Sequence, residues 1–461
     1  MLAIGMTIFA YISPVIIGFS GLTLLQNQTK RNLALSEKLA LSYVIGTGFL
    51  SFYIFYIGLF RIKFTWGSIA IFPSVAVFIL LLLAKKRGMK YVLGLAPRRR
   101  FGRLNFGKKL LMAGISVLLL WKIIFIGFLI ISKPTYFDDS VSNYNYKAKN
   151  FYYNRALVLD PAHPDFLGGH EPRYPDMNPL FKTWVSLCLG EWKEYAVNLN
   201  TLLYFLALGL IMYHNLARII SPYMSLIFTY LLLSIPLLTF HAGFAHMDLI
   251  VSFYCFAGLV YLFRWIREKD RLSFLISALL FCVGISAKDE VIGLFIGGAL
   301  PVLILYQIIQ STKLKKIFQT TGIYLSIVIF LNIPWFVVKK IYNLASGPPD
   351  HYRKFEFHPE AFSILGTYLF DSGNYNILWT TFFCLLIISL PLIIRTELKY
   401  ITVSLAGILT IILVLFIFTP FFEYLRIGTT INRALLSAVP VAILFLAVAY
   451  GKLLKINDIT S

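Results

Sequence analysis

Residues 85–139 read KKRGMKYVLGLAPRRRFGRLNFGKKLLMAGISVLLLWKIIFIGFLIISKPTYFDD, and they join three unlike pieces of chain. The first, 85–109, holds ten Lys or Arg and no acid, and the second, 110–132, is apolar and long enough to cross a bilayer as a helix. The third ends in Asp138 and Asp139, the first acids after Glu37. This order predicts a cytoplasmic loop, a membrane helix and a carboxylate pair at the opposite surface. Because carboxylates are costly near lipid, the pair is a candidate functional site.

Composition extends this pattern to the whole chain. Of 461 residues, 58% are hydrophobic and only 14% are charged, with a mean hydropathy of +0.76. A soluble domain carries about 25% charged residues. Repeated runs of about 20 apolar residues are too long for barrel strands and predict an all-α polytopic membrane protein. We expect about 13 transmembrane helices (11–14), near 2–25, 41–62, 66–84, 110–132, 196–214, 221–240, 247–266, 272–287, 291–310, 317–338, 375–394, 400–420 and 434–451.

The basic residues set the predicted orientation. The net charge is +21, but the cations gather between apolar runs, as in cytoplasmic loops that face anionic lipid. We therefore expect membrane lipids as partners and no nucleic acid. With 85–109 inside, alternation also places inside the groups Lys30, Arg31 and Lys38; Arg264, Arg267, Lys269 and Arg271; Lys313, Lys315 and Lys316; and Lys452 and Lys455.

Three parts follow from this topology. Residues 1–109 form an N-terminal three-span extension with its basic loop, 110–451 a transmembrane core with long outer loops at 133–195 and 339–374, and 452–461 a cytoplasmic tail. Four scattered cysteines without CxxC spacing predict neither disulfides nor a zinc site. The N-terminus lacks a basic region and a cleavage site, which favours a retained span in a prokaryotic plasma (inner) membrane.

The first outer loop is too long for an idle connector. Its segment 140–157 predicts an amphipathic interfacial helix, with Tyr144, Tyr146, Phe151 and Tyr152 near headgroup level. Several prolines predict irregular structure after it.

Charged and polar side chains from distant spans fall on this outer side. They include Asp138, Asp139, Lys147, Lys149, His163, Asp165, His170, Glu171, Arg173, Asp176, His241, His246, Asp248, Lys288, Asp289, Glu290, Arg353, Lys354, His358, Glu360, Glu423, Arg426 and Arg433. Carboxylates beside cations suit acid–base chemistry and anion binding. A fitting reaction is group transfer from a lipid-linked phosphate: a carboxylate deprotonates the acceptor hydroxyl, and Lys or Arg binds the departing phosphate.

Simpler interpretations exist for these residues. The Asp pair could cap a helix, and Lys288 to Glu290 could be a hairpin tip. Arg433 could extend from a span end towards water. His241, His246 and Asp248 lack the His-x₃-His spacing of a helical metal site, so the sequence favours a solvated, structural role for them.

Six short motifs, in this order, resemble the GT-C superfamily of membrane glycosyltransferases. They are Phe137-Asp138-Asp139 after a span, the juxtamembrane stretch 143–149 (NYNYKAK), the entry 174–180 (YPDMNPL), 246–249 (HMDL), 284–290 (GISAKDE) and 432–440 (NRALLSAVP). The likeness covers about residues 110–450. It is nearest to protein O-mannosyltransferases, aminoarabinose transferases and lipopolysaccharide-core transferases.

The resemblance implies an inverting transfer of sugar from a polyprenyl-phosphate-linked donor to a lipid or glycan acceptor at the outer face. Asp138 would be the general base and Asp139 its neighbour, and Lys288 and Arg433 would bind the donor phosphate. Acceptor or supporting roles would fall to Lys147, His170, Glu171, Asp248 and Glu290. The first three spans have no counterpart in the shortest family members, and we expect no soluble acceptor-binding domain after the last span, where some relatives carry one.

Two other functions stay open. A transporter or flippase for a lipid-linked sugar would bury ionisable groups at the bilayer midplane, whereas we expect Lys122 and His214 near span ends. A non-catalytic subunit of an envelope-polysaccharide complex would tolerate loss of the carboxylates. No cofactor is certain. A divalent metal held by Asp138, Asp139 and His170 is compatible with the sequence but not required by it.

Overall fold

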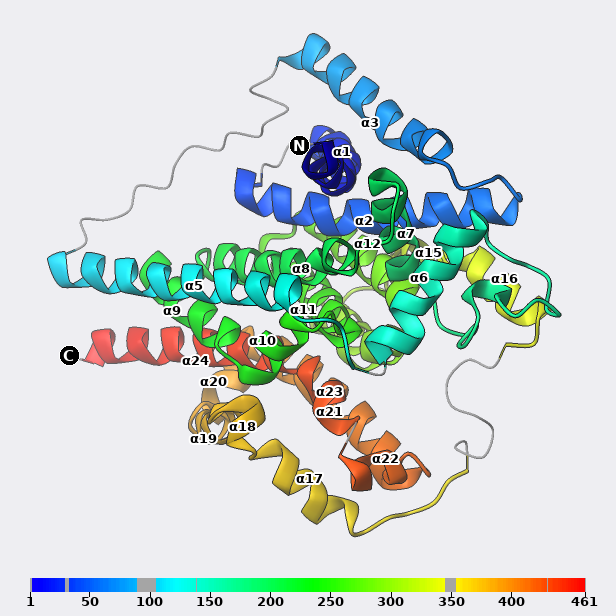
Figure 1. Cartoon of the computed structure of the whole chain (residues 1–461). Coiled ribbons are helices and arrows are strands. Elements are labelled where there is room, and N and C mark those ends of the chain that lie inside the picture. Colours follow the sequence, from blue (N-terminus) through cyan, green and yellow to red (C-terminus); the bar gives the residue numbers. More distant parts are fainter. Residues whose placement is uncertain are drawn as a thin grey trace.

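The computed structural model describes residues 2–29, 33–88, 105–137, 139–344, 354–428 and 430–460, and this part of the chain is helical with no strand. Asp138 and most of the basic loop 85–109 lie outside these ranges. The prediction of an all-α fold is therefore confirmed for the described residues (Figure 1).

Nine segments of the described chain are long and apolar enough to cross a membrane, or up to eleven if two bent pairs each count as one span. The predicted count of about thirteen is not confirmed. The nine are α1 (Leu2–Thr29), α2 (Leu35–Leu59), α3 (Trp66–Arg87), α5 (Phe106–Ser132), α8 (Glu194–Leu216), α11 (Met247–Glu268), the run α13–η3–α14 (Glu290–Leu294, Phe295–Ala299, Leu300–Ile309), α21 (Leu398–Phe418) and the run α23–α24 (Ile431–Leu436, Val439–Thr460).

Two predicted spans are broken by a sharp bend. The run 221–240 is α9 (Pro222–Leu233) and α10 (Pro236–Gly243), bent by 66°. The run 317–338 is α15 (Leu314–Phe330) and α16 (Ile333–Ile341), bent by 61°. Each second helix begins with a proline in its first turn, where the ring is accepted although it would interrupt a continuous helix.

The remaining helices are shorter. They are η1 (Asp139–Asn145), α6 (Tyr146–Asn154), η2 (Phe166–Gly168), α7 (Met177–Leu189), α12 (Arg271–Ala287), α17 (Ala361–Leu369), α18 (Ser372–Tyr375), α19 (Leu378–Ile388), α20 (Leu390–Arg395) and α22 (Phe422–Ile427).

Helix α11 is the centre of the bundle. Every residue from Met247 to Leu262 is buried, as expected for a helix that is enclosed by protein on all sides. It packs against α8, α12 and α24. Helix α2 packs in turn against α1, α7, α8 and α12.

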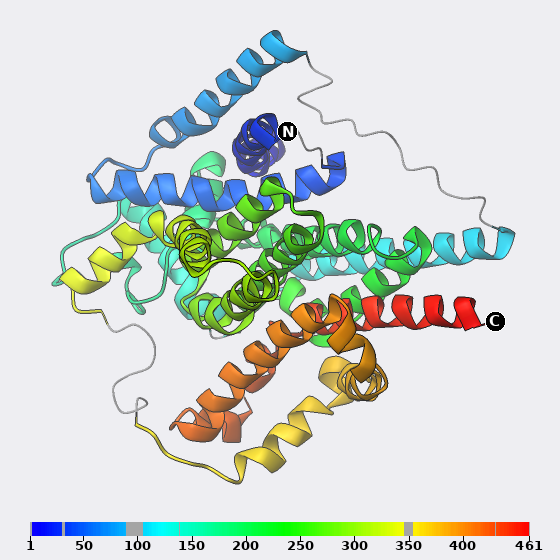
Figure 2. The same ribbon diagram turned by 180° about the vertical axis from the view of Figure 1, so that it is seen from behind.

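Different helices lie at the two opposite edges of the bundle (Figures 1 and 2). The start of α5 and the end of α24 lie at one edge, and α6, α16 and α22 lie at the opposite edge, which we call the α6 edge.

Each end of α11 meets charged partners. At its C-terminal end, the buried Glu37 of α2 accepts hydrogen bonds of 2.7 Å from Arg264 Nη1 and from the Tyr261 hydroxyl.

Two predictions about single residues are wrong. Lys38 is not in a loop, because α2 begins at Leu35 and buries the ammonium against Thr23 Oγ1 at 2.8 Å. Tyr144, Phe151 and Tyr152 are buried in the protein, and their position at headgroup level stays a prediction. Lys122 lies well inside α5, where Nζ donates to the Leu233 carbonyl at 3.0 Å beside the α9–α10 break.

Candidate active site

Four side chains from four separate segments form a continuous chain of ion pairs at the N-terminal end of α11. Asp248 is the hub: its Oδ1 accepts from Lys288 Nζ at 2.9 Å and its Oδ2 from Arg433 Nε at 2.7 Å. The Nη2 group of Arg433 also pairs with Asp139 Oδ2. We call Asp139, Asp248, Lys288 and Arg433 the Asp248 cluster.

Helix ends put these groups together. Asp139 opens η1, the next helix after α5, Asp248 is in the first turn of α11, and Arg433 is in α23. Lys288 follows α12 with extended backbone (φ −160°, ψ 137°), which turns the chain out of the helix. Since helix ends leave backbone groups unpaired, they are natural places for polar side chains to gather.

Hydrogen bonds between segments hold these ends in place. The Ser140 hydroxyl donates to the Ala245 carbonyl at 3.3 Å, and Ser252 Oγ donates to the Leu436 carbonyl at 2.9 Å. Asn143 Nδ2 donates to Asp139 Oδ1 at 3.1 Å, so the Asp139 carboxylate is oriented from both sides.

The four side chains of the Asp248 cluster differ in their exposure to solvent. The side chains of Asp248 and Lys288 are 5% and 9% exposed, whereas those of Arg433 and Asp139 are 23% and 30% exposed. A ligand that reaches the cluster therefore meets Arg433 and Asp139 first. The hydrogen bonds from Arg433 to Asp248 and Asp139 use two of its five N–H donors, and a guanidinium can bind a phosphate through the others.

Lys288 keeps its charge despite its burial. Burial alone would lower the pKa of Lys288, but the carboxylates of Asp248 and Glu290 outweigh it and hold that pKa well above its ordinary value. Glu290 Oε1 lies 2.8 Å from Lys288 Nζ and its side chain is half exposed.

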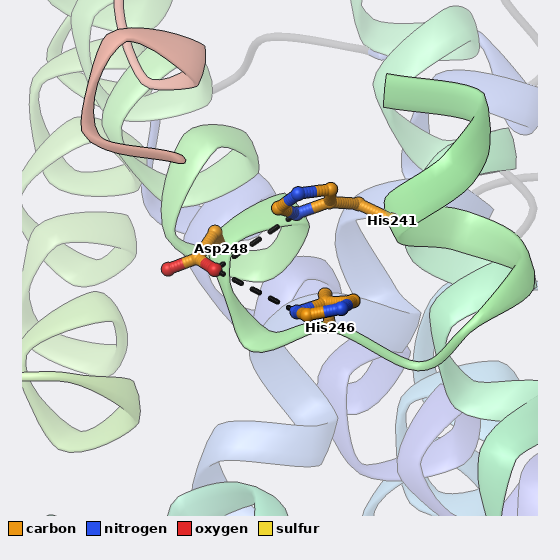
Figure 3. Close-up of side chains that lie close together, drawn as sticks. All are labelled: His241, His246 and Asp248. Carbon is orange, nitrogen blue, oxygen red and sulfur yellow. Dashed lines mark ion pairs between the residues drawn. The ribbon is translucent and has the colours of Figure 1, made fainter. Parts of the chain in front are cut away.

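Two histidines lie beside Asp248 (Figure 3). The Nδ1 atoms of His241, in α10, and His246, just before α11, are 3.9 and 4.0 Å from Asp248 Oδ2. The imidazole rings stack with centroids 4.5 Å apart. Both residues are buried, so the solvated position that the sequence favoured is wrong. Burial also lowers the pKa of His246, opposed by the nearby Asp248 carboxylate.

The remaining predicted residues have different surroundings. Lys147 is buried in α6, and its Nζ contacts Asp176 Oδ1 at 2.6 Å and the Tyr174 carbonyl at 2.7 Å, so it ties α6 to the loop before α7. His170 is exposed, and Glu171 pairs with Arg173 at 2.8 Å. Among the described residues, no hydrogen bond or ion pair joins His170 or Glu171 to the Asp248 cluster. Asp138 lies outside the described residues.

Sequence reasoning missed the hydrogen bond from Asn143 to Asp139 and wrongly placed His241 and His246 in solvent. Asn143 lies four residues after Asp139, a spacing that brings two side chains together in a helix, and this is a signal that could have been used. The histidines gave no such signal, because the bend between α9 and α10 decides where His241 points.

Comparison of the chain with protein-family models, with curated proteins and with solved structures finds no match. The function of this protein is therefore inferred from the residues of the site.

Proposed function

We propose that this protein is an integral-membrane glycosyltransferase that moves a sugar from a polyprenyl-phosphate-linked donor to a lipid or glycan acceptor. The supporting observation is that Asp139, Asp248, Lys288 and Arg433, each selected from sequence as a carboxylate or phosphate-binding cation, meet in one cluster. An anionic lipid donor would be recognised there by the cations, while its tail stays in the bilayer.

In the proposed reaction the acceptor hydroxyl oxygen forms a bond to the anomeric carbon, and the bond from that carbon to the phosphate oxygen breaks. A carboxylate takes the hydroxyl proton, and the polyprenyl phosphate leaves with an added negative charge. Arg433 and Lys288 stabilise this charge, which is the usual role of fixed cations in such steps. Because Arg433 and Asn143 already bind Asp139, we assign the proton to Asp138 and give Asp139 an orienting role.

The test is sugar transfer by the purified protein in lipid, with a panel of polyprenyl-phosphate sugars. We expect Asp138→Asn to lower the rate by about 10²–10⁴, the usual contribution of a general base. Arg433→Lys should lower kcat, because Arg433 is proposed to stabilise the charge that develops as the phosphate leaves. The matched control is Glu423→Gln, a half-exposed carboxylate on α22 that pairs with Arg426 at 2.8 Å. Full activity of the Asp138→Asn and Asp139→Asn proteins would disprove the proposal.

Transport of a lipid-linked sugar is a second candidate, supported by the two broken spans and by Lys122 inside α5. Transporters build their sites from discontinuous helices and buried ionisable groups. Movement of labelled lipid across proteoliposome membranes, without release of free polyprenyl phosphate, would favour transport over transfer.

A further inference from the structure

The histidine pair and Asp248 present three candidate ligand atoms, one from each side chain, that lie within 4.8 Å of one another in a buried place (Figure 3). We propose that His241, His246 and Asp248 bind one divalent transition-metal ion, with Zn²⁺ the best fit. Two imidazoles and a carboxylate form a ligand set that suits zinc and its first-row neighbours, whereas Mg²⁺ and Ca²⁺ prefer oxygen ligands.

The first support is the lack of protein partners. His241 Nδ1 and both ring nitrogens of His246 are buried and have no hydrogen-bond partner among the described residues. Buried polar atoms nearly always have one, so such a group calls for an explanation. An ion in front of Asp248 Oδ2 would satisfy both Nδ1 atoms at once.

The second support is geometric. Two ligands at about 2.0–2.1 Å from a tetrahedral zinc ion are about 3.4 Å apart. The two Nδ1 atoms lie 3.9 and 4.0 Å from Asp248 Oδ2. A closure of about half an ångström, within reach of small side-chain rotations, would therefore complete these two ligand pairs.

Charge is the main objection, since two cations contact the same carboxylate. However, Lys288 also pairs with Glu290, and Arg433 also pairs with Asp139. These outer carboxylates balance the two cations, so the charge of Asp248 remains for the metal. Its Oδ2 accepts one hydrogen bond from Arg433 and can offer a second lone pair to an ion.

Three protein ligands leave the fourth position of a tetrahedral ion open, as in catalytic zinc sites. That position could take water or an oxygen of an anionic ligand near Arg433. Metal binding itself does not depend on the proposed sugar transfer.

The experiment measures metal content and cobalt absorption on the full-length protein, purified with a tag free of histidine. After chelator treatment and exchange into Zn²⁺, we expect about one zinc per chain by mass spectrometry. Loss of a residue that only orients a metal ligand weakens metal binding by about 10–100-fold. Because His241→Ala and His246→Ala each remove a proposed ligand, each should weaken Zn²⁺ binding by at least that factor. His214→Ala is the matched control, because His214 bonds to Ser36 instead, at 2.7 Å. That variant should keep its zinc.

Equal zinc content in all four proteins would show surface binding only and would overturn the proposal. Cobalt replacement tests the wild type alone, so a misfolded variant cannot hide the result. A 1:1 complex should give visible absorption bands of low-symmetry Co²⁺ that excess Mg²⁺ does not displace, and absence of these bands would also overturn it. Because neither readout needs a sugar donor, failure of metal binding and failure of sugar transfer are separate outcomes.

Discussion

The contact between Lys147 and Asp176 provides a quantitative test of the packing at the α6 edge. The Nζ–Oδ1 distance is 2.6 Å, and both side chains are only 2% exposed. Burial raises the pKa of Asp176 even though the Lys147 charge opposes it, so the pair does not fully offset its loss of water. Removal of only Lys147 would leave a buried carboxylate unpaired.

We therefore expect Lys147→Met to destabilise the protein by about 3–5 kcal/mol, the usual cost of breaking a buried ion pair from one side. The Tyr174 carbonyl would also lose its donor. The double variant Lys147→Met, Asp176→Leu should recover much of this loss, because a buried pair that is replaced by apolar groups is often neutral or better. Such a recovery of stability would show that the loss in the single variant comes from breaking the Lys147–Asp176 ion pair.

The assay is the unfolding midpoint in detergent, followed by tryptophan fluorescence. For a chain of this length the single variant should lower the midpoint by about 3–5 °C. The control is Lys149→Met, also in α6, where Nζ lies 5.4 Å from the centroid of the Trp192 ring and contributes about 0.5–1 kcal/mol. If Lys147→Met and Lys149→Met shift the midpoint equally, or if the double variant is worse than the single, the reasoning is refuted.

Three further predictions concern the same unfolding midpoint. Lys122→Met should cost about 0.6–2 kcal/mol, as for other hydrogen bonds between membrane helices, because it removes the bonds that Lys122 Nζ donates to the Leu233 carbonyl and to Thr239 Oγ1 at the α9–α10 break; an unchanged midpoint would show that the Thr239 hydroxyl, which also donates to the Leu233 carbonyl at 3.3 Å, is sufficient there. Burial lowers the pKa of Lys182 to about 7, so the unfolded chain binds more protons above that pH. Wild type should gain about 2 kcal/mol between pH 7 and 9 relative to Lys182→Gln, and parallel pH profiles would contradict this. Gly46→Leu should cost about 1–3 kcal/mol or more, because any Cβ there meets the Pro14 backbone; normal stability would mean that α1 and α2 pack more loosely.

The breaks in two spans could not be predicted from the sequence. Pro236 and Pro334 lie inside runs that were predicted as single spans, and each is in the first turn of a new helix. Pro14 and Pro73 also lie inside apolar runs, yet α1 and α3 continue through them. A proline marks a place where a helix can break, and packing against neighbours determines whether it does.

The candidate active site could likewise be predicted from the sequence only in part. Asp139, Asp248, Lys288 and Arg433 could be selected one by one, because a charge at the end of an apolar run is visible in the sequence. Their pairing could not, since Arg433 and Asp139 are separated by 294 positions in the chain. The sequence also placed Lys147 among the acceptor candidates. In the structure, Lys147 in α6 forms a buried ion pair with Asp176, in the loop before α7.

The amino-acid sequence by itself determined that this is a helical, membrane-type protein, because a run of apolar residues is a local property that needs no partner to be recognised. It also placed Asp139, Asp248, Lys288 and Arg433 at the ends of apolar runs. Only the tertiary structure decided that Asp248 is the hub of the ion pairs, that two spans are bent, and that His241 and His246 are buried beside the hub. Those features depend on contacts between distant segments, and such contacts follow from how the helices pack.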